Sequence, residues 1–155
     1  MNSALAIARL FLFVRESGDN RGLRVEAIQH WSTGQPGDSW CCEFATMVLD
    51  LLFQGAAPIL RQGSCESVRQ LATQRGWITT TPSPGDLFLR LHPDTGLAHH
   101  IGFYVETNAD GSIGTIAGNT SADGTSANGD RVAEHPIRPD AGSIAYIAYP
   151  RPITA

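Results

Sequence analysis

The sequence has neither an excess of basic residues nor a cluster of them. Its 155 residues contain 11 Lys and Arg against 15 Asp and Glu, which gives a formal net charge of −4. A protein that binds nucleic acid usually neutralises phosphates with a basic patch or stripe. The composition therefore excludes a nucleic-acid partner and suits a neutral or polar substrate.

A long apolar run is also absent. The most apolar segment near the start of the chain, residues 4–14, is interrupted by Arg9. It is too short to cross a bilayer, and it lacks the basic residues and the small-residue cleavage site that flank a signal peptide. We therefore expect no membrane span, and synthesis in the cytoplasm without a signal peptide.

Cysteine is scarce, with Cys41, Cys42 and Cys65 in the whole chain. Three cysteines cannot form an even disulfide framework, these lack the paired spacing of a structural zinc site, and adjacent cysteines rarely bridge each other. We therefore predict at least one free thiol. Stability needs no covalent link, because a chain of about 150 residues buries roughly 68–70% of its unfolded surface. Residues 1–155 are expected to form one domain.

The first half of the chain has the spacing of amphipathic helices, with apolar residues recurring at intervals of three and four. The predicted helices cover residues 2–15, 23–31, 41–54 and 65–75. The third follows a turn in which Asp38 or Ser39 is placed to cap it. Its first turn therefore contains Cys41 and Cys42.

The second half changes to short apolar runs separated by Gly, Asn and Asp, a pattern typical of antiparallel strands. The predicted strands cover residues 87–91, 100–105, 112–117 and 144–149. Residues 119–130 are rich in Ser, Asn, Gly and Asp, which predicts a surface loop. Helices followed by strands in one domain indicate an α+β fold, with N-terminal helices packed on a C-terminal antiparallel sheet.

Cys41 has the setting of a catalytic thiol. The start of a helix lowers the pKa of a thiol, and unpaired backbone N–H groups there can bind the oxyanion that forms when a carbonyl is attacked. The simpler interpretation makes Cys41 and Cys42 small core residues beside Trp40 and Phe44. Neighbouring residues on a helix point about 100° apart, so one cysteine can face a cleft while the other packs inward.

Two histidines open one of the predicted strands. His99 and His100 point to opposite faces of the sheet, so only one can face the helix that carries Cys41. Gly102 would let a substrate or that helix approach closely. Asn119, at the end of the next strand, is placed to hold the imidazole in the tautomer that a thiol needs. A lone histidine is more often a surface residue, and Asn119 is equally compatible with an ordinary loop start.

Four motifs, in this order, carry a family resemblance: GDSWCCEFATMVLD, PGDLFL, HHIGFYV and TIAGNTS. They resemble the CHAP family (cysteine, histidine-dependent amidohydrolase/peptidase) of the papain-like NlpC group. The upstream string GDNRGLRVEAIQHW is similar to the leader helix region of bacterial and phage members, so the resemblance runs from about Glu16 to Thr120. In that family the nucleophile follows a tryptophan, and the histidine precedes an aliphatic residue and a glycine. The resemblance therefore implies Cys41 as nucleophile, His100 as general base and Asn119 as the residue that orients the imidazole.

The resemblance also implies a function. It predicts hydrolysis of peptide or amide bonds through a thioester intermediate, with no metal or organic cofactor. The expected substrate is peptidoglycan or a muropeptide, reached in the cell wall or periplasm after release or export. One position departs from the family pattern, because Ala117 stands where many members have an acidic residue. A non-catalytic cell-wall-binding or structural module with the same fold is therefore the alternative function.

Other chemistries compete for the same residues. The candidate zinc ligands are Cys41, Cys42, His99 and His100. Neighbouring residues on a helix or strand diverge, which disfavours zinc. A calcium loop counted from Asn119 would have Ser121, Asp123, Gly124 and Asp130 at positions three, five, six and twelve. That loop lacks the usual Asp at its first position and Glu at its twelfth. A redox role for the adjacent cysteines is disfavoured because Cys42 is expected to pack inward.

Overall fold

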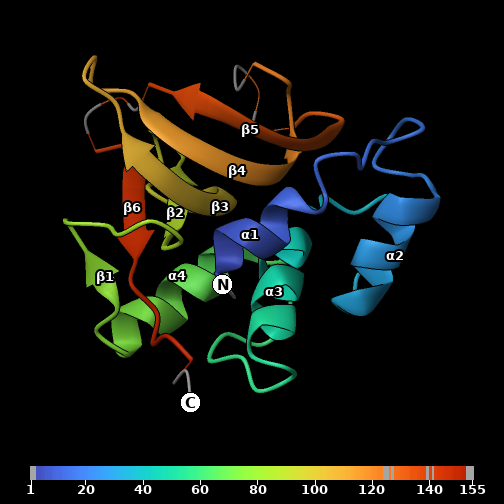
Figure 1. Cartoon of the computed structure of the whole chain (residues 1–155), viewed down its shortest axis with the longest axis horizontal. Helices are drawn as coiled ribbons and strands as arrows, with labels where there is room; N and C mark the ends of the chain where they lie inside the picture. Colours follow the sequence, from blue (N-terminus) through green and yellow to red (C-terminus); the bar gives the residue numbers. More distant parts are fainter. Residues whose placement is uncertain (1–2, 124–125, 127, 139, 141, 153–155) are drawn as a thin grey trace.

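The computed structural model describes residues 3–123, 126, 128–138, 140 and 142–152. Within these residues the chain forms four helices and one six-stranded sheet, which confirms the α+β class (Figure 1). The helices are α1 (Ala4–Arg9), α2 (Leu23–Trp31), α3 (Cys41–Leu52) and α4 (Cys65–Gln74). The strands are β1 (Ile78–Thr79), β2 (Leu87–Leu91), β3 (Ala98–Thr107), β4 (Ile113–Thr120), β5 (Arg131–Ile137) and β6 (Ile144–Ile147).

The sheet has the strand order β1-β6-β2-β3-β4-β5, and each neighbouring pair is antiparallel. Figure 1 shows the curled sheet on one side of the molecule and the helices on the other. Helix α3 packs against β3 and β4, and α1 and α2 pack against α3. The helix that begins at Cys41 therefore lies at the centre of the fold.

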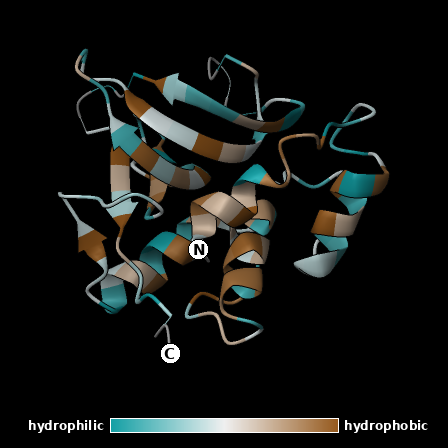
Figure 2. Ribbon diagram, viewed as in Figure 1, coloured by the Kyte–Doolittle hydropathy of each residue, from teal (hydrophilic) through white to brown (hydrophobic). Residues whose placement is uncertain are grey.

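Helix α3 is buried because it is apolar on most of its surface. Ten of its twelve residues are buried, and the helix is largely brown in the hydropathy view of Figure 2. A helix that is apolar nearly all round belongs in a protein core. Its side chains join those of the inner sheet face, such as Ile101 and Phe103, in the main hydrophobic cluster. This packing fixes the position of the helix start.

Local spacing predicted α2 and β2 with their observed bounds, and the ends of α3 and α4 to within two residues. Helix α1 is shorter than the predicted 2–15, whose first residue lies outside the described part. The chain leaves the helix to pair with the start of β5. The N–H of Val132 donates to the Val14 carbonyl at 3.1 Å, and the N–H of Glu16 donates to the Asp130 carbonyl at 2.7 Å. Pairing with so distant a strand leaves no trace in local periodicity.

Strands β1 and β5 were not predicted. Strand β1 has two residues, and β5 contains Pro136 among polar side chains. Proline cannot donate to a strand ladder and is confined to edge strands, which is the position of β5. Strand β4 runs to Thr120, so Asn119 lies at the end of that strand as expected, and the loop predicted to begin at residue 119 does not include Asn119 or Thr120. The predicted loop over 119–130 falls partly on residues 124, 125 and 127, outside the described residues.

The glycine that admits the cysteine helix is Gly118, whereas the sequence suggested Gly102. A Cβ placed on Gly102 would lie 2.5 Å from the carbonyl oxygen of Ile116, on the neighbouring strand. A Cβ placed on Gly118 would lie 2.8 Å from Phe44 Cβ and from Trp40 Cζ3. Gly118 therefore lets the first turn of α3 rest directly on β4.

Replacing Gly118 with alanine is expected to lower the free energy of unfolding by about 1–3 kcal/mol, because the added methyl group overpacks this contact. Denaturant unfolding would measure the change. The matched control is Gly114→Ala on the same strand, where a Cβ would meet ordinary contacts at 3.4 Å. Equal losses in the two variants would contradict the interpretation.

Candidate active site

Cys41 is the first residue of α3, and 4% of it is exposed. Trp40 occupies the N-cap position before it, and no side chain caps the helix, so the prediction that Asp38 or Ser39 caps it is wrong. Asp38 Oδ2 instead accepts a hydrogen bond from the N–H of Gln35 at 2.8 Å, which closes the preceding turn. Among the described residues, the backbone N–H of Cys41 has no acceptor. It therefore remains free to bind an oxyanion.

Trp40 holds the start of the helix in place. Its ring is fully buried, as the sequence predicted, and its Nε1–H donates to Glu16 Oε1 at 2.8 Å. The other carboxylate oxygen of Glu16 accepts from the N–H of Asn20 at 3.1 Å. Trp40, the residue before Cys41, is thus held from two sides. The loop between α1 and α2 binds its indole N–H, and Gly118 of β4 packs against its ring.

His100 lies beside Cys41, while its neighbour His99 is directed elsewhere. His100 is buried on β3, with its ring 6.0 Å from that of Phe88, and its proximity lowers the pKa of the Cys41 thiol. His99 is exposed and lines a cavity of about 400 Å³ together with Arg90. Of the two histidines, only His100 can exchange a proton with Cys41.

Asn119 and His100 lie on neighbouring strands, β4 and β3. The recorded pairing of these strands ends at Phe103 and Ile116, and each of the two residues lies three positions beyond that pair. Asn119 is buried in a left-handed conformation with φ 52°, which asparagine tolerates better than most residues. The Nδ1 atom of His100 and the Oδ1 atom of Asn119 are both buried, and neither has a hydrogen-bond partner within the described residues. A ring N–H and an amide oxygen are complementary hydrogen-bonding groups, so each of these two atoms is of the kind that the other lacks.

A fourth residue, Cys65, is part of this site and was not predicted. It is the first residue of α4, and its Sγ lies 3.8 Å from that of Cys41. All three cysteines are free and buried. The sequence could place Cys65 at a helix start, but no local signal shows that two helix starts meet.

Cys65 changes the electrostatics expected for the nucleophile. The sequence predicts a lowered pKa for Cys41, whereas in the structure the hydrogen bond with Cys65 and burial raise it well above its ordinary value. The neighbouring His100 acts in the opposite direction and lowers it. Cys41 therefore rests as a neutral thiol, and a base must remove its proton when it attacks.

The position that departs from the family pattern lies in apolar surroundings. Ala117 belongs to a second hydrophobic cluster, on the other face of the sheet, together with Phe88 and Tyr104. A carboxylate there would be buried among apolar side chains at a high desolvation cost. An alanine at this position therefore fits the packing, and Asn119 is the remaining candidate for orienting the imidazole.

The alternative metal sites gain no assembled ligand set. Within the described residues, no three His, Cys, Asp or Glu side chains converge as they would around an ion. Gly124 of the candidate calcium loop lies outside those residues. The described part of the chain therefore offers no such cluster for zinc.

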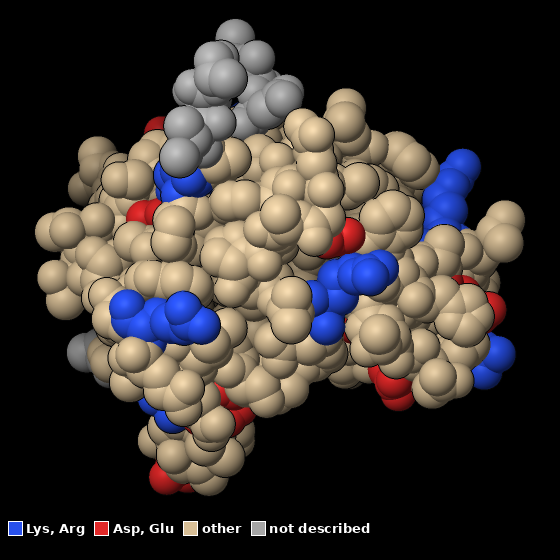
Figure 3. Space-filling model, turned by 90° about the horizontal axis from the view of Figure 1, so that it is seen from below, with Lys and Arg blue, Asp and Glu red and all other residues tan. Residues whose placement is uncertain are grey.

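The surface and the helices bear on possible partners. Figure 3 shows one face of the molecule, on which charged side chains form small separate groups within a largely uncharged surface. That face has no continuous basic patch for a polyanion. No helix among the described residues combines the length and apolar character needed to cross a membrane.

Glu43, two residues after Cys41, is a buried carboxyl group. One per cent of it is exposed, and its Oε2 atom has no hydrogen-bond partner in the described part of the chain. Its carboxyl group packs directly against Gly34, where a side chain would not fit. Burial, and then the nearby charge of Asp38, raise the pKa of Glu43 from 4.5 to about 7.

Replacing Glu43 with glutamine is expected to stabilise the protein by up to about 3 kcal/mol at pH 8, with little effect at pH 4.5. Between about pH 4.5 and about pH 7 the Glu43 carboxyl group stays protonated in the folded state and ionises in the unfolded chain. The free energy of unfolding therefore falls as pH rises through this range. Glutamine keeps the shape and has no proton to lose. Denaturant unfolding at both pH values would measure this, with Glu106→Gln, at an exposed position of β3, as control. An unchanged pH dependence in Glu43→Gln would contradict the assignment.

The chain matches no protein-family model, no curated protein and no solved structure. The case for a function therefore depends on the motifs and on the arrangement of Cys41, His100 and Asn119.

Proposed function

We propose that this protein is a papain-like cysteine hydrolase of the CHAP type that cleaves peptide or amide bonds in peptidoglycan. The observation that carries the proposal is the meeting of Cys41, at an uncapped helix start, with the imidazole of His100. Asn119 is buried on β4, the strand next to the one that carries that imidazole. The proposed nucleophile, base and orienting group come from three elements, α3, β3 and β4. The same three residue types form Cys-His-Asn sites.

The chemistry follows from these positions. His100 removes the proton of the neutral Cys41 thiol as the sulfur attacks the scissile carbonyl carbon. The free N–H of Cys41 stabilises the oxyanion. The protonated imidazole then gives its proton to the leaving nitrogen, and water activated by the same ring hydrolyses the thioester. Asn119 holds the ring through this cycle, and the reaction requires no cofactor.

Burial of Cys41 favours a second candidate function. With 4% of the residue exposed and a raised thiol pKa, the fold would also serve as a non-catalytic cell-wall-binding module. Hydrolysis instead requires that side chains around Cys41 shift when the substrate binds. The two candidate functions differ in whether the Cys41 thiol attacks a carbonyl carbon of the substrate.

Digestion of purified peptidoglycan separates these candidates. The protein would be incubated with insoluble cell-wall material, and the soluble products would be analysed by mass spectrometry. Hydrolysis predicts new termini, and their identity distinguishes cleavage within the stem peptide from cleavage between the sugar and the peptide. Sedimentation of the protein with the wall, without new termini, would support the binding module and contradict hydrolysis. Either activity places the protein in the cell wall or periplasm, reached after release or export.

A further inference from the structure

Cys41 and Cys65 meet although 24 positions separate them. Their Sγ atoms lie 3.8 Å apart, and each residue begins a helix, α3 or α4. A disulfide has an S–S distance of about 2.05 Å, so the two sulfurs need to approach by roughly 1.8 Å. Side-chain rotation can supply a movement of this size.

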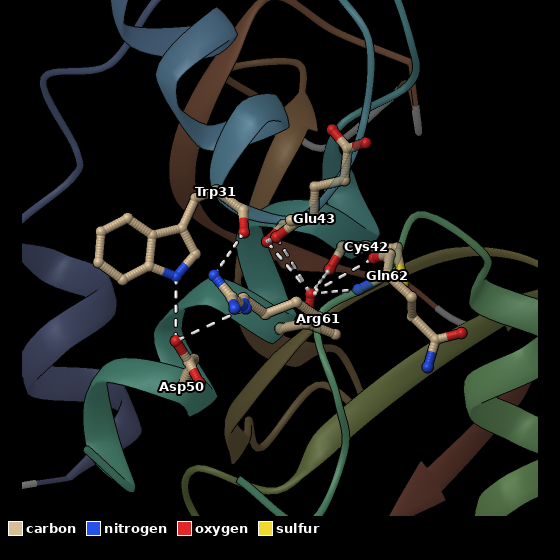
Figure 4. Close-up of polar contacts among 8 residues, drawn as sticks. Trp31, Cys42, Glu43, Asp50, Arg61 and Gln62 are labelled. Carbon is tan, nitrogen blue, oxygen red and sulfur yellow. Dashed lines mark hydrogen bonds and ion pairs between the residues drawn. The ribbon is translucent and has the colours of Figure 1, made fainter. Parts of the chain in front are cut away.

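The segment before Cys65 is tied firmly to the neighbouring helices. Thr46 Oγ1, on α3, makes contacts of 3.3 Å with both the N–H and the carbonyl oxygen of Gln62. Arg61 donates to the Trp31 carbonyl at 2.9 Å, at the end of α2 (Figure 4). These bonds hold the start of α4 near the start of α3.

The other side of Cys65 is fixed to the sheet. Glu66, the next residue, accepts a hydrogen bond from the N–H of Ala98 at 2.9 Å through Oε2. Ala98 opens the strand that carries His100. Cys65 is therefore held between α3 and β3, so its contact with Cys41 follows from the fold around it.

We propose that Cys41 and Cys65 are an oxidation site and form a reversible disulfide when the protein meets hydrogen peroxide. The Cys41 sulfur attacks the peroxide: an S–O bond forms, the O–O bond breaks, and water leaves with the thiol proton, giving a sulfenic acid. The Cys65 sulfur then attacks the oxidised sulfur. An S–S bond forms, the S–O bond breaks, and the departing hydroxide takes the Cys65 proton as a second water. The two thiols lose two electrons and the peroxide gains them.

Cys41 is the sulfur that reacts first with the peroxide, because His100 lies beside it and can take its proton. Cys42 is fully buried and has no exposed surface for the peroxide to reach. Cys42 does lie near enough to Cys65 to raise the pKa of that thiol, so a bond between Cys42 and Cys65 is the competing product. The experiment must therefore tell the adjacent cysteines apart.

One consequence of this site rests on the proposed function. A disulfide removes the nucleophile, so oxidation stops hydrolysis and reduction restores it. Cys65 also limits further oxidation of Cys41 to sulfinic acid, which thiol reductants do not reverse.

Peptide mapping tests the disulfide directly. The chain contains no lysine, so trypsin cleaves only after arginine. It therefore separates residues 25–61, with Cys41 and Cys42, from residues 62–69, with Cys65. After peroxide treatment, free thiols would be alkylated, the protein reduced, and the released thiols labelled with heavy reagent. Heavy label on Cys41 and Cys65, with light label on Cys42, is expected. Heavy label on Cys42, or no heavy label on Cys41 and Cys65, would overturn the inference.

An activity measurement gives the second readout. Wild type is expected to lose hydrolysis after peroxide and regain it with dithiothreitol, whereas Cys65→Ser is expected to lose it without recovery. Circular dichroism would check that the Cys65→Ser variant is folded. If the variant does not fold, the peptide mapping of the wild-type protein still tests the disulfide. If Cys41 and Cys65 form a disulfide but the protein hydrolyses nothing, the proposed function alone is contradicted. If hydrolysis survives peroxide and no disulfide forms, the proposed disulfide alone is contradicted.

Discussion

Replacing Cys41 with alanine is expected to abolish release of new termini from peptidoglycan, with a rate loss of at least about a thousandfold. The Cys41 sulfur is the one beside His100, at a helix start whose N–H groups are free. Without it no thioester forms. Quantification of soluble products over time would measure the loss, and circular dichroism would show that the variant keeps its fold.

Cys42→Ala is the matched control for this variant. Cys42 is fully buried and its side chain points away from that of Cys41 by about 100° around the helix. Its removal should leave hydrolysis largely intact, although the core loses a sulfur atom. Full activity in Cys41→Ala, or equal losses in both variants, would show that Cys41 is not the nucleophile.

Replacing His100 with alanine is expected to slow hydrolysis by about a hundredfold to ten-thousandfold, because the reaction loses its proton acceptor and donor. A second readout separates this role from a structural one. Since His100 lowers the pKa of Cys41, alkylation of Cys41 by iodoacetamide should also become slower in the variant.

His99→Ala is the control for the histidine, because it removes the exposed neighbour that faces a separate cavity. Both hydrolysis and alkylation should stay close to wild type. An alkylation rate that His100→Ala leaves unchanged would argue that the imidazole does not act on the thiol. In wild type, the raised pKa of Cys41 predicts alkylation that accelerates as pH rises well above neutrality.

Local sequence patterns were sufficient for the elements that carry the candidate site. Apolar periodicity placed the start of α3 at Cys41 and the bounds of β2 where the structure has them. Alternation along β3 showed that His99 and His100 must face different ways. These predictions depend on residues a few positions apart, which is the range over which helix and strand periodicity acts.

Long-range contacts were not predictable in the same way. The approach of Cys65 to Cys41 depends on how two helices pack, and the pKa of Cys41 rises because of that approach. The close contact at Gly118 depends on the distance between a helix and a sheet, which no single segment specifies. The catalytic roles of Cys41, His100 and Asn119 remain predictions from motifs, now with a defined geometry.

Both outer strands of the sheet are poor sites for adding another strand. Strand β1 offers two residues, and β5 has Pro136, which lacks an N–H to donate. The segment at Val14 and Glu16 already bonds to the beginning of β5. Unpaired strand edges are the usual route by which sheet proteins associate into aggregates. This molecule should therefore resist self-association through the edges of its sheet.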